Sequence, residues 1–397
     1  MVHRDAHATP SPIRLVEFTK AFWLGGTECQ VVELLRGLGP GYEISVAVLD
    51  EVGPLVGEVR SLGFLPRAFP LRGSFLSVNT ARQIKRMAGW LRDTGAELVH
   101  AHDFYSTLVG VPAARLAGVK VVVGRLDLLH WHGPSRSAAL GMLSRAADGV
   151  VVNAEAVRQS CLAQGIPGER MTLIRNGLDL PRFDARLALP PDAPVPEVGT
   201  SPAVVQVANM SHVVKRQEDL LQALARVREQ VGSVHAFFVG DGCRRPQLEE
   251  LARRLKLENL AHFLGFRTDI PAILARASVG VLCSDVEGLS NAIIEGMAAR
   301  LPMVVTRVGG NPELVTDGER GLLVEPRRPD QLADAIAGLV TDHARARRLG
   351  IAGRDFVERE LTAAHLVERH DRWYRRIARP KETPDRSNAT IGTCIRA

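Results

Sequence analysis

The sequence of 397 residues lacks the patterns of secreted, membrane-spanning and zinc-stabilised proteins. Its five cysteines are scattered without a C-x-x-C pair, and no histidines stand at zinc-ligand spacing, so neither a disulfide framework nor a structural metal is expected. No uninterrupted apolar run approaches the roughly 18 residues that span a bilayer, and no signal-peptide pattern is present. We therefore expect a soluble or peripheral protein of the reducing cytoplasm that needs no metal and no other cofactor.

Aromatic residues make up only 5% of the chain, and they form no clusters with basic residues despite a net charge of +6. Proteins that bind single-stranded nucleic acid stack bases on such clusters, so no nucleic-acid partner is expected. One segment differs, because 80–95, TARQIKRMAGWLRDTG, has the pattern of a helix with Arg82, Lys85 and Arg86 beside Trp90. This helix is either an ordinary solvated face or a peripheral contact at the inner face of the membrane.

Short β-branched runs alternate with helical patterns, which is typical of α/β proteins with parallel sheets. In the first half the predicted strands are 13–18, 44–48, 98–101, 119–123, 149–153 and 171–174. In the second half the predicted strands are 203–208, 234–239, 260–264, 279–283, 303–306 and 321–324, with helices at 219–230, 246–256 and 329–341. The sequence therefore predicts two doubly wound, Rossmann-like domains that face each other across a cleft.

A proline-rich linker divides these two domains. Segment 187–202, LALPPDAPVPEVGTSP, can neither continue a helix nor donate regularly to a sheet, so it separates a domain over 12–186 from one over 203–355. The apolar spacing of 356–379 predicts a helix that crosses back to the first domain. Residues 380–397 have little apolar content and are predicted to be a disordered tail.

Two glycines follow the first predicted strand in WLGGTECQVVELL. Gly25 and Gly26 predict a turn, Thr27 is the expected N-cap of the next helix, and Glu28 falls in its first turn. Paired glycines let backbone amides approach a phosphate, and a helix N-terminus adds partial positive charge. A glycine turn without any ligand would have the same sequence, so both interpretations stay open.

The segment SDVEGLSNAIIEGMA places two carboxylates, Glu287 and Glu295, eight positions apart. A loop carries the first acid, and Gly288, Leu289 and Ser290 would present the free amides of a helix that continues through Glu295. At 1.5 Å per residue, helical geometry would separate the two acids by about 12 Å. They could then bind hydroxyls at the two ends of a long ligand, such as a sugar joined through a diphosphate to a ribose. The alternative is two acids on a solvated helix.

These residues carry a family resemblance. SDVEGLSNAIIEGMAARLPMVVTRVGGNPELV resembles the donor-binding signature of the retaining, GT-B-fold glycosyltransferases of family 4, also called glycosyl transferases group 1. LGGTECQVVELL, LVHAHDFYS, LIRNGLDLPRF and FFVGDGCRRPQLEELA resemble further segments of that family in the right order. The similarity extends from about residue 12 to 345 and implies transfer of a sugar from a nucleotide diphosphate donor to a glycan or lipid-linked acceptor.

The resemblance also implies a role for each matching residue. Glu287 would bind hydroxyls of the donor sugar, Glu295 those of the ribose, and the amides of 288–290 the diphosphate. Lys215 would stabilise the leaving diphosphate. The base would lie against the backbone near Phe266 and Arg267.

The reaction implied for the family is metal-independent and retains the anomeric configuration, because a diphosphate oxygen takes the acceptor proton. On the acceptor side we expect His102, Asp103 and Arg125. For His102 and Asp103 the alternative role is to hold the loop after the fourth strand. Asp127 matches the aspartate that follows the histidine in many relatives, and it is expected among the catalytic residues with Lys215 and Glu287.

Two positions depart from the family pattern. Asn209 stands where many relatives carry arginine, so Arg216 is considered as a replacement cation, and Leu126 stands where many have histidine, with His130 and His132 close by. An active glycosyltransferase of polysaccharide or glycoconjugate biosynthesis is the leading hypothesis, and a catalytically silent nucleotide-sugar-binding protein is the alternative. A GT-B epimerase or phosphorylase is a third interpretation.

Overall fold

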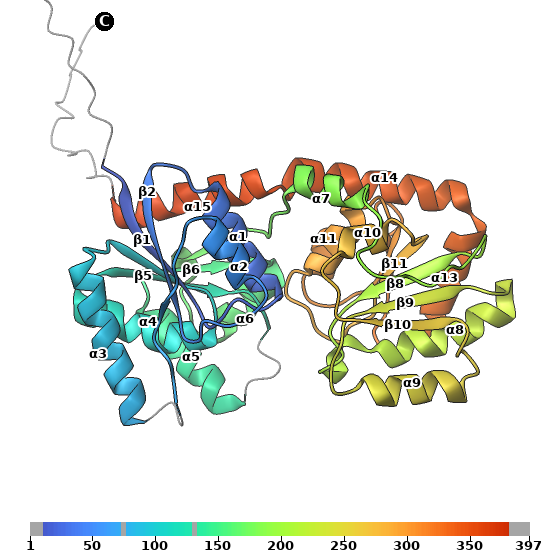
Figure 1. Cartoon of the computed structure of the whole chain (residues 1–397), viewed down its shortest axis with the longest axis horizontal. Helices are drawn as coiled ribbons and strands as arrows, with labels where there is room; N and C mark the ends of the chain where they lie inside the picture. Colours follow the sequence, from blue (N-terminus) through green and yellow to red (C-terminus); the bar gives the residue numbers. More distant parts are fainter. Residues whose placement is uncertain (1–10, 73–76, 129–132, 381–397) are drawn as a thin grey trace, which may run out of the picture.

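The computed structural model describes residues 11–72, 77–128 and 133–380, and it has two lobes, each built on a parallel β-sheet (Figure 1). His130, His132 and the predicted tail after Pro380 lie outside the described residues. None of the helices within these ranges combines the length and the apolar character needed to cross a bilayer.

The first sheet has seven parallel strands in the order β3-β2-β1-β4-β5-β6-β7. Its strands are β1 Ile13–Thr19, β2 Tyr42–Val48, β3 Arg67–Ala68, β4 Leu98–Ala101, β5 Lys120–Arg125, β6 Gly149–Val152 and β7 Met171–Leu173. Its helices are α1 Gly26–Gly37, α2 Val56–Ser61, α3 Val78–Asp93, α4 Phe104–Ala117, α5 Pro134–Ala146 and α6 Glu155–Ala163. Six of these strands were predicted, and the missed strand, β3, has only two residues.

Residue alternation along β1 explains why helices cover both faces of this sheet. Ile13 and Leu15 pack with Leu34 of α1 and Trp373 of the C-terminal helix, whereas residues of opposite parity, such as Phe18, join the cluster beneath α3 and α4. The chain therefore buries both faces of the sheet, as parallel sheets require.

The second sheet has six parallel strands in the order β10-β9-β8-β11-β12-β13. Its strands are β8 Ala203–Val207, β9 His235–Val239, β10 Ala261–Gly265, β11 Val279–Leu282, β12 Met303–Thr306 and β13 Leu322–Val324. Its helices are α8 Gln217–Val231, α9 Arg245–Arg254, α10 Ile270–Leu274, α11 Asn291–Ala298, α12 Asn311–Leu314 and α13 Pro329–Thr341. Every strand predicted in this half is present.

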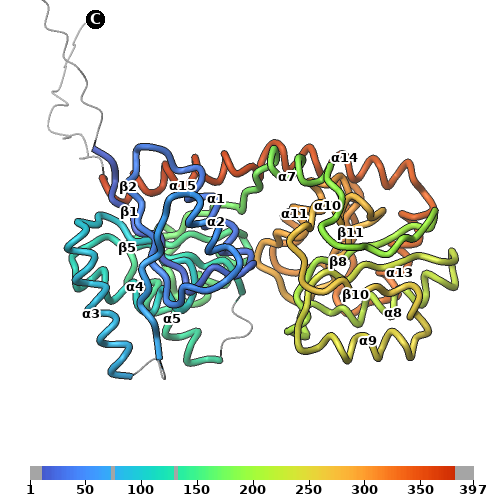
Figure 2. Tube along the Cα trace, viewed as in Figure 1, coloured from blue at the N-terminus to red at the C-terminus, as the bar shows by residue number. Residues whose placement is uncertain are grey.

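The chain passes between the lobes twice, and Figure 2 shows both passages along one side of the molecule. The first leads into α7, Leu180–Leu187, which packs against α10 of the second domain before the linker begins. The second runs through α14, His343–Glu360, and α15, Ala363–Ala378, which returns to the first domain.

The helix expected over 356–379 is in fact divided between α14 and α15. The Thr362 side chain accepts the amide of His365 as the N-cap of α15, which favours a new helix start over continuation of α14. The residues at the break pair with Leu178, whose amide donates to Leu361 O at 2.8 Å and whose carbonyl accepts from Ala363 N at 2.9 Å. The two crossing segments therefore bind each other between the lobes.

Candidate active site

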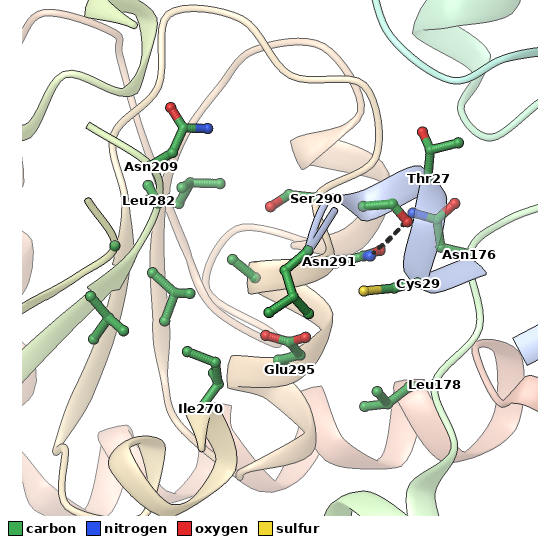
Figure 3. A pocket seen from close by; sticks show the side chains of 18 of the residues that line it. Thr27, Cys29, Asn176, Leu178, Asn209, Ile270, Leu282, Ser290, Asn291 and Glu295 are labelled. Carbon is green, nitrogen blue, oxygen red and sulfur yellow. Dashed lines mark hydrogen bonds between the residues drawn. The ribbon is translucent and has the colours of Figure 1, made fainter. Parts of the chain in front are cut away.

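A cavity of about 610 Å³ lies between the two domains at the carboxyl edges of their sheets. Figure 3 shows side chains from both domains around it. In the second sheet β8 and β11 are neighbours, and the strand order reverses between them. Ligands of open α/β sheets bind at such switch points, because the loops after the two strands diverge there. Here the loop after β8 carries Lys215 and the loop after β11 carries Glu287.

The structure brings Lys215 and Glu287 together, 72 residues apart in the chain. Lys215 Nζ donates to Glu287 Oε1 at 2.6 Å, and Ser284 Oγ donates to the same oxygen at 2.6 Å. Glu287 is only 8% exposed, so its charge needs these partners. Both side chains line the cavity, and no described residue bonds to Glu287 Oε2, which can accept a ligand hydroxyl.

The helix after Glu287 begins later than the sequence suggested. Ser290 is the N-cap and Asn291 the first residue of α11, so Glu287 lies in the preceding loop and the axial estimate of about 12 Å does not apply to this pair. Gly288, Leu289 and Ser290 line the cavity ahead of the helix, as expected. Their amides precede the positive end of the helix dipole, which suits an anionic group.

Glu295 lies in the second turn of α11 and points into the cavity below Ser290 and Asn291 (Figure 3). Burial raises the pKa of its carboxyl to about 7, and no hydrogen bond from another described residue compensates. A carboxylate in this position gains most from a ligand that donates hydroxyl protons to it.

The two arginines predicted at the donor site, Arg216 and Arg267, both bind nearby acids through their guanidinium groups. Arg216, a left-handed residue before α8, directs its guanidinium to Asp219 at 2.7 Å and does not line the cavity. Arg267 lines it, but its guanidinium binds Asp269 at 2.5 Å and Ala193 O of the linker at 2.9 Å. Arg216 was considered as a replacement cation for the donor, and its side chain is bound to Asp219 instead. The contact predicted at Arg267 was with its backbone, so its side-chain ion pair does not bear on that prediction.

Asn209 and Phe266 line the cavity with exposed side chains, and Phe266 is 57% exposed. The Asn209 amide points away from Ser290 and Glu295 in Figure 3, and its Oδ1 accepts the amide of Ser211 at 3.2 Å. Asn209 therefore does not supply the missing positive charge.

The glycine turn of the first domain faces the start of α11. Gly25, not Thr27, is the N-cap of α1, because Gly25 has extended backbone angles and the helix already begins at Gly26. Both glycines line the cavity, and Gly26 O accepts from Asn291 Nδ2 at 3.3 Å. Glu28 lies in the first turn as predicted, and burial raises its pKa to about 7.

None of the residues predicted on the acceptor side, His102, Asp103 and Arg125, lines the cavity, whereas Asp127, predicted as catalytic, does. It lies opposite Gly288, where an added Cβ would collide with Leu126 O and meet Asp127 Cα at 3.4 Å. Arg125 is buried away from the cavity, where it donates to Ser144 Oγ at 3.3 Å and Gln164 Oε1 at 3.0 Å. Desolvation lowers the pKa of its guanidinium.

Asp103 and His102 have structural partners. The Asp103 carboxylate caps α4 through the amides of Tyr105 at 2.7 Å and Ser106 at 3.0 Å, and it also accepts from Lys20 N at 2.7 Å. This arrangement is the loop-holding role that the sequence left as an alternative. His102 is buried, with its Nε2 against the Glu17 carboxylate.

Among the described residues, one group of side chains could hold a metal ion: Glu17, His100 and His102. All three are buried and none lines the cavity. Tyr374 OH donates to Glu17 Oε1 at 3.0 Å and lies 2.6 Å from His100 Nδ1, whereas His100 Nε2 is buried without a partner among the described residues. The group is therefore a buried hydrogen-bond network apart from the cavity.

Comparisons with known proteins agree with this architecture. The family profile described as Glycosyltransferase Family 4 matches residues 24–182, and that of Glycosyl transferases group 1 matches residues 201–342. The GDP-mannose-dependent alpha-(1-6)-phosphatidylinositol monomannoside mannosyltransferase of Mycobacterium tuberculosis is 32% identical over 289 residues, which are 66% of this chain and 73% of that protein. The chain belongs to glycosyltransferase family 4.

Other relatives of this glycosyltransferase match it over different lengths. N-acetyl-alpha-D-glucosaminyl L-malate synthase of Bacillus anthracis is 28% identical over 176 residues, so the match spans about half of each protein, 44% of this chain and 46% of the relative. The solved structure of Anabaena HepE in complex with UDP and glucose has a TM-score of 0.79 over 91% of this chain and 99% of its own, at 21% identity. That likeness shows the GT-B fold.

Sequence reasoning missed the asparagines that line the cavity of this glycosyltransferase, Asn153, Asn176 and Asn291. Asn176 stands in the N-G-x-D segment that carries the family resemblance, but no partner for its side chain could be inferred from the sequence. Amide side chains have no charge or periodicity that reveals a role, so only the folded arrangement does.

Proposed function

We propose that this glycosyltransferase moves a sugar from a nucleotide diphosphate donor to a glycan or lipid-linked acceptor, with retention of the anomeric configuration and without a metal ion. It would act in the cytoplasm, in polysaccharide or glycoconjugate biosynthesis. The observation that carries the proposal is the pairing of Lys215 with Glu287 beside the amides that precede α11. A cation, backbone donors and a buried carboxylate thus converge on one side of the cavity.

Donor binding would rearrange this pair. A diphosphate at the start of α11 competes with Glu287 for the Lys215 ammonium, which carries three protons and can bind two oxygens at once. Glu287 would then accept hydroxyls of the donor sugar. Because Lys215 is held in the cavity by Glu287 before the donor arrives, little side-chain entropy remains to be lost on binding.

The proposed chemistry needs charge stabilisation more than a protein acid. The bond from the anomeric carbon to the diphosphate breaks, its electron pair leaves with the diphosphate, and positive charge develops on the sugar ring. Lys215 and the amides before α11 stabilise the departing charge. The acceptor oxygen forms the new bond on the same face, and its proton passes to a diphosphate oxygen.

A peripheral membrane contact would supply a lipid-linked acceptor. Helix α3 lies on the outer edge of the first lobe (Figure 1), and Arg82, Lys85 and Arg86 on it are exposed. Trp90 packs on Phe69 with ring centroids 5.5 Å apart, so the charges, and not the indole, would make the contact.

The test is a melting-temperature screen of the purified protein with UDP-, GDP- and ADP-sugars, in EDTA and in magnesium, followed by chromatography of released nucleotide diphosphate. A donor should raise the melting temperature equally in EDTA and magnesium and be hydrolysed slowly. Binding without any release would favour the silent alternative, for which Asn209 and Leu126 are the departures from the family pattern. No stabilisation by any nucleotide sugar would refute the proposal.

A further inference from the structure

Three asparagine side chains connect the two domains beside the cavity. Asn153 follows β6 and Asn176 follows β7 in the first domain, whereas Asn291 is the first residue of α11 in the second. Asn176 Nδ2 donates to Asn291 Oδ1 at 2.7 Å and to Leu289 O at 3.3 Å. Asn176 Oδ1 accepts from Asn153 Nδ2 at 3.4 Å. Asn176 thus binds both its own domain and the donor-binding loop of the other.

Asn291 and Asn153, at the two ends of this asparagine chain, form hydrogen bonds at two further strand ends. Asn291 Nδ2 donates to Gly26 O at 3.3 Å in the glycine turn after β1, and Asn153 Nδ2 also donates to Leu126 O at 3.2 Å after β5. The first residue of α11 is therefore connected to the carboxyl edge of the first sheet at several strands. Figure 3 shows Asn176 and Asn291 close together next to Thr27.

Two of these hydrogen bonds are buried, from Asn153 to Asn176 and from Asn176 to Leu289 O, whereas the one from Asn291 to Gly26 O is exposed. Asn153 is 2% exposed and Asn176 is 6% exposed, so solvent does not replace a bond that is lost. A buried amide left without a partner costs more than the bond itself contributed. The domain separation at which Asn176 can satisfy its amide is therefore narrow, because hydrogen bonds weaken steeply with distance and angle.

Backbone contact limits how close the domains can come at the same place. A Cβ on Gly288 would collide with Leu126 O, and one on Gly310 would lie 2.9 Å from Ala154 Cβ. Because these two residues have no side chain, the two domains can come into direct backbone contact here. The asparagine hydrogen bonds then hold the domains together. The two features together fix the position and orientation of the loop before α11.

We propose that Asn176 is a positioning residue of the transfer reaction, which fixes the donor-binding loop against the acceptor-side domain. This inference rests on the proposed function. The predicted donor contacts Lys215, Glu287 and Glu295 all belong to the second domain, so they would bind a donor even when the asparagine chain is broken. The acceptor would be held by the first domain, and a displacement of about 1 Å between reacting groups lowers a rate by about a hundredfold.

The test variant is Asn176→Asp, which keeps the shape of the side chain but loses both N–H donations and directs a carboxylate at Asn291 Oδ1 and Leu289 O. The matched control is Asn311→Asp. Asn311 is fully buried and donates from Nδ2 to Thr306 O at 3.0 Å within one domain. Both variants lose a buried amide donor, but only one loses a connection between domains.

The first measurement uses the full chain without ligand. Hydrogen exchange of peptides covering 286–295 should become at least tenfold faster in Asn176→Asp and change by less than threefold in Asn311→Asp. An unchanged rate of hydrogen exchange in these peptides of Asn176→Asp would show that the asparagine hydrogen bonds do not stabilise the loop before α11.

The second measurement is steady-state kinetics with the nucleotide sugar selected by the melting-temperature screen. Asn176→Asp should lower kcat for transfer at least tenfold, change donor KM by less than threefold, and raise the ratio of hydrolysis to transfer, because water gains access where the acceptor is misplaced. A general structural defect would not change that ratio. Absence of turnover in the wild type would refute the proposed function, whereas wild-type turnover with an unaltered ratio in Asn176→Asp would refute only the positioning role.

Discussion

Replacing Lys215 by methionine should destabilise the protein and inactivate it, because the change leaves a buried carboxylate without its cation. Lys215 Nζ lies 2.6 Å from Glu287 Oε1, and the two side chains are 18% and 9% exposed. Removing one partner of a fully buried pair costs about 3–5 kcal/mol. Here the pair is partly exposed in the wild type, and Ser284 still donates to the carboxylate in the variant, so we expect a loss of about 2 kcal/mol.

The double variant Lys215→Met with Glu287→Gln separates stability from catalysis. Neither side chain of the double variant is charged, so most of the lost stability should return. Its kcat should stay low, because the leaving diphosphate still lacks a cation, a contribution of about 10²–10³ in comparable sites. The single variant should lose a similar factor in kcat.

Thermal unfolding and release of nucleotide diphosphate are the two assays. A loss of about 2 kcal/mol corresponds to a decrease of about 4–8 °C in Tm for a domain of this size. Two results would refute the reasoning. One is a single variant as stable as the wild type, and the other is a double variant no more stable than the single one.

Three further predictions concern Glu295, helix α15 and the basic residues of helix α3. The pKa of Glu295 near 7 predicts that donor KM falls about tenfold between pH 6 and pH 8 as the carboxyl ionises, and Glu295→Gln should remove that dependence. Deleting α15 should expose the apolar face of the first sheet, lower Tm and abolish transfer, and full activity without it would contradict this role. Changing Arg82, Lys85 and Arg86 to glutamate should release the protein from anionic liposomes at low salt, and unchanged sedimentation would assign these charges to solubility.

The fold could be predicted from the sequence because both domains follow strong local rules. β-Branched runs such as 119–123 and 303–306 are buried strands, and the prolines of 187–202 interrupt the pattern where no strand or helix forms. The break between α14 and α15 was missed, because the apolar spacing continues through Leu361 while the Thr362 cap decides against a single helix. Caps compete with helix continuation by about 1 kcal/mol, which periodicity does not reveal.

Site residues could be predicted from the sequence only where the position of a residue after a strand determines its neighbours in the fold. Lys215 and Glu287 follow adjacent strands, so their meeting agrees with the switch-point rule. Arg216 and Arg267 follow strands too, yet each pairs with an acid only two or three residues away. A nearby acid therefore decides whether the guanidinium of an arginine after a strand is available to a ligand. An arginine with an acid two or three residues away should not be assigned to ligand binding from the sequence alone.

His102, predicted on the acceptor side, is likewise bound by an acid, but one that is distant in the sequence. Glu17 is fully buried in β1, and a carboxylate there is stable only with donors around it. It accepts from Tyr374 of α15 at 3.0 Å and contacts His102 after β4. Burial, together with the Glu17 charge, holds the pKa of Tyr374 well above its usual range, so the phenol remains a donor. Helix α15 therefore holds β1 near its carboxyl end, and His102 contributes to that edge of the sheet by binding Glu17 rather than by facing the cavity.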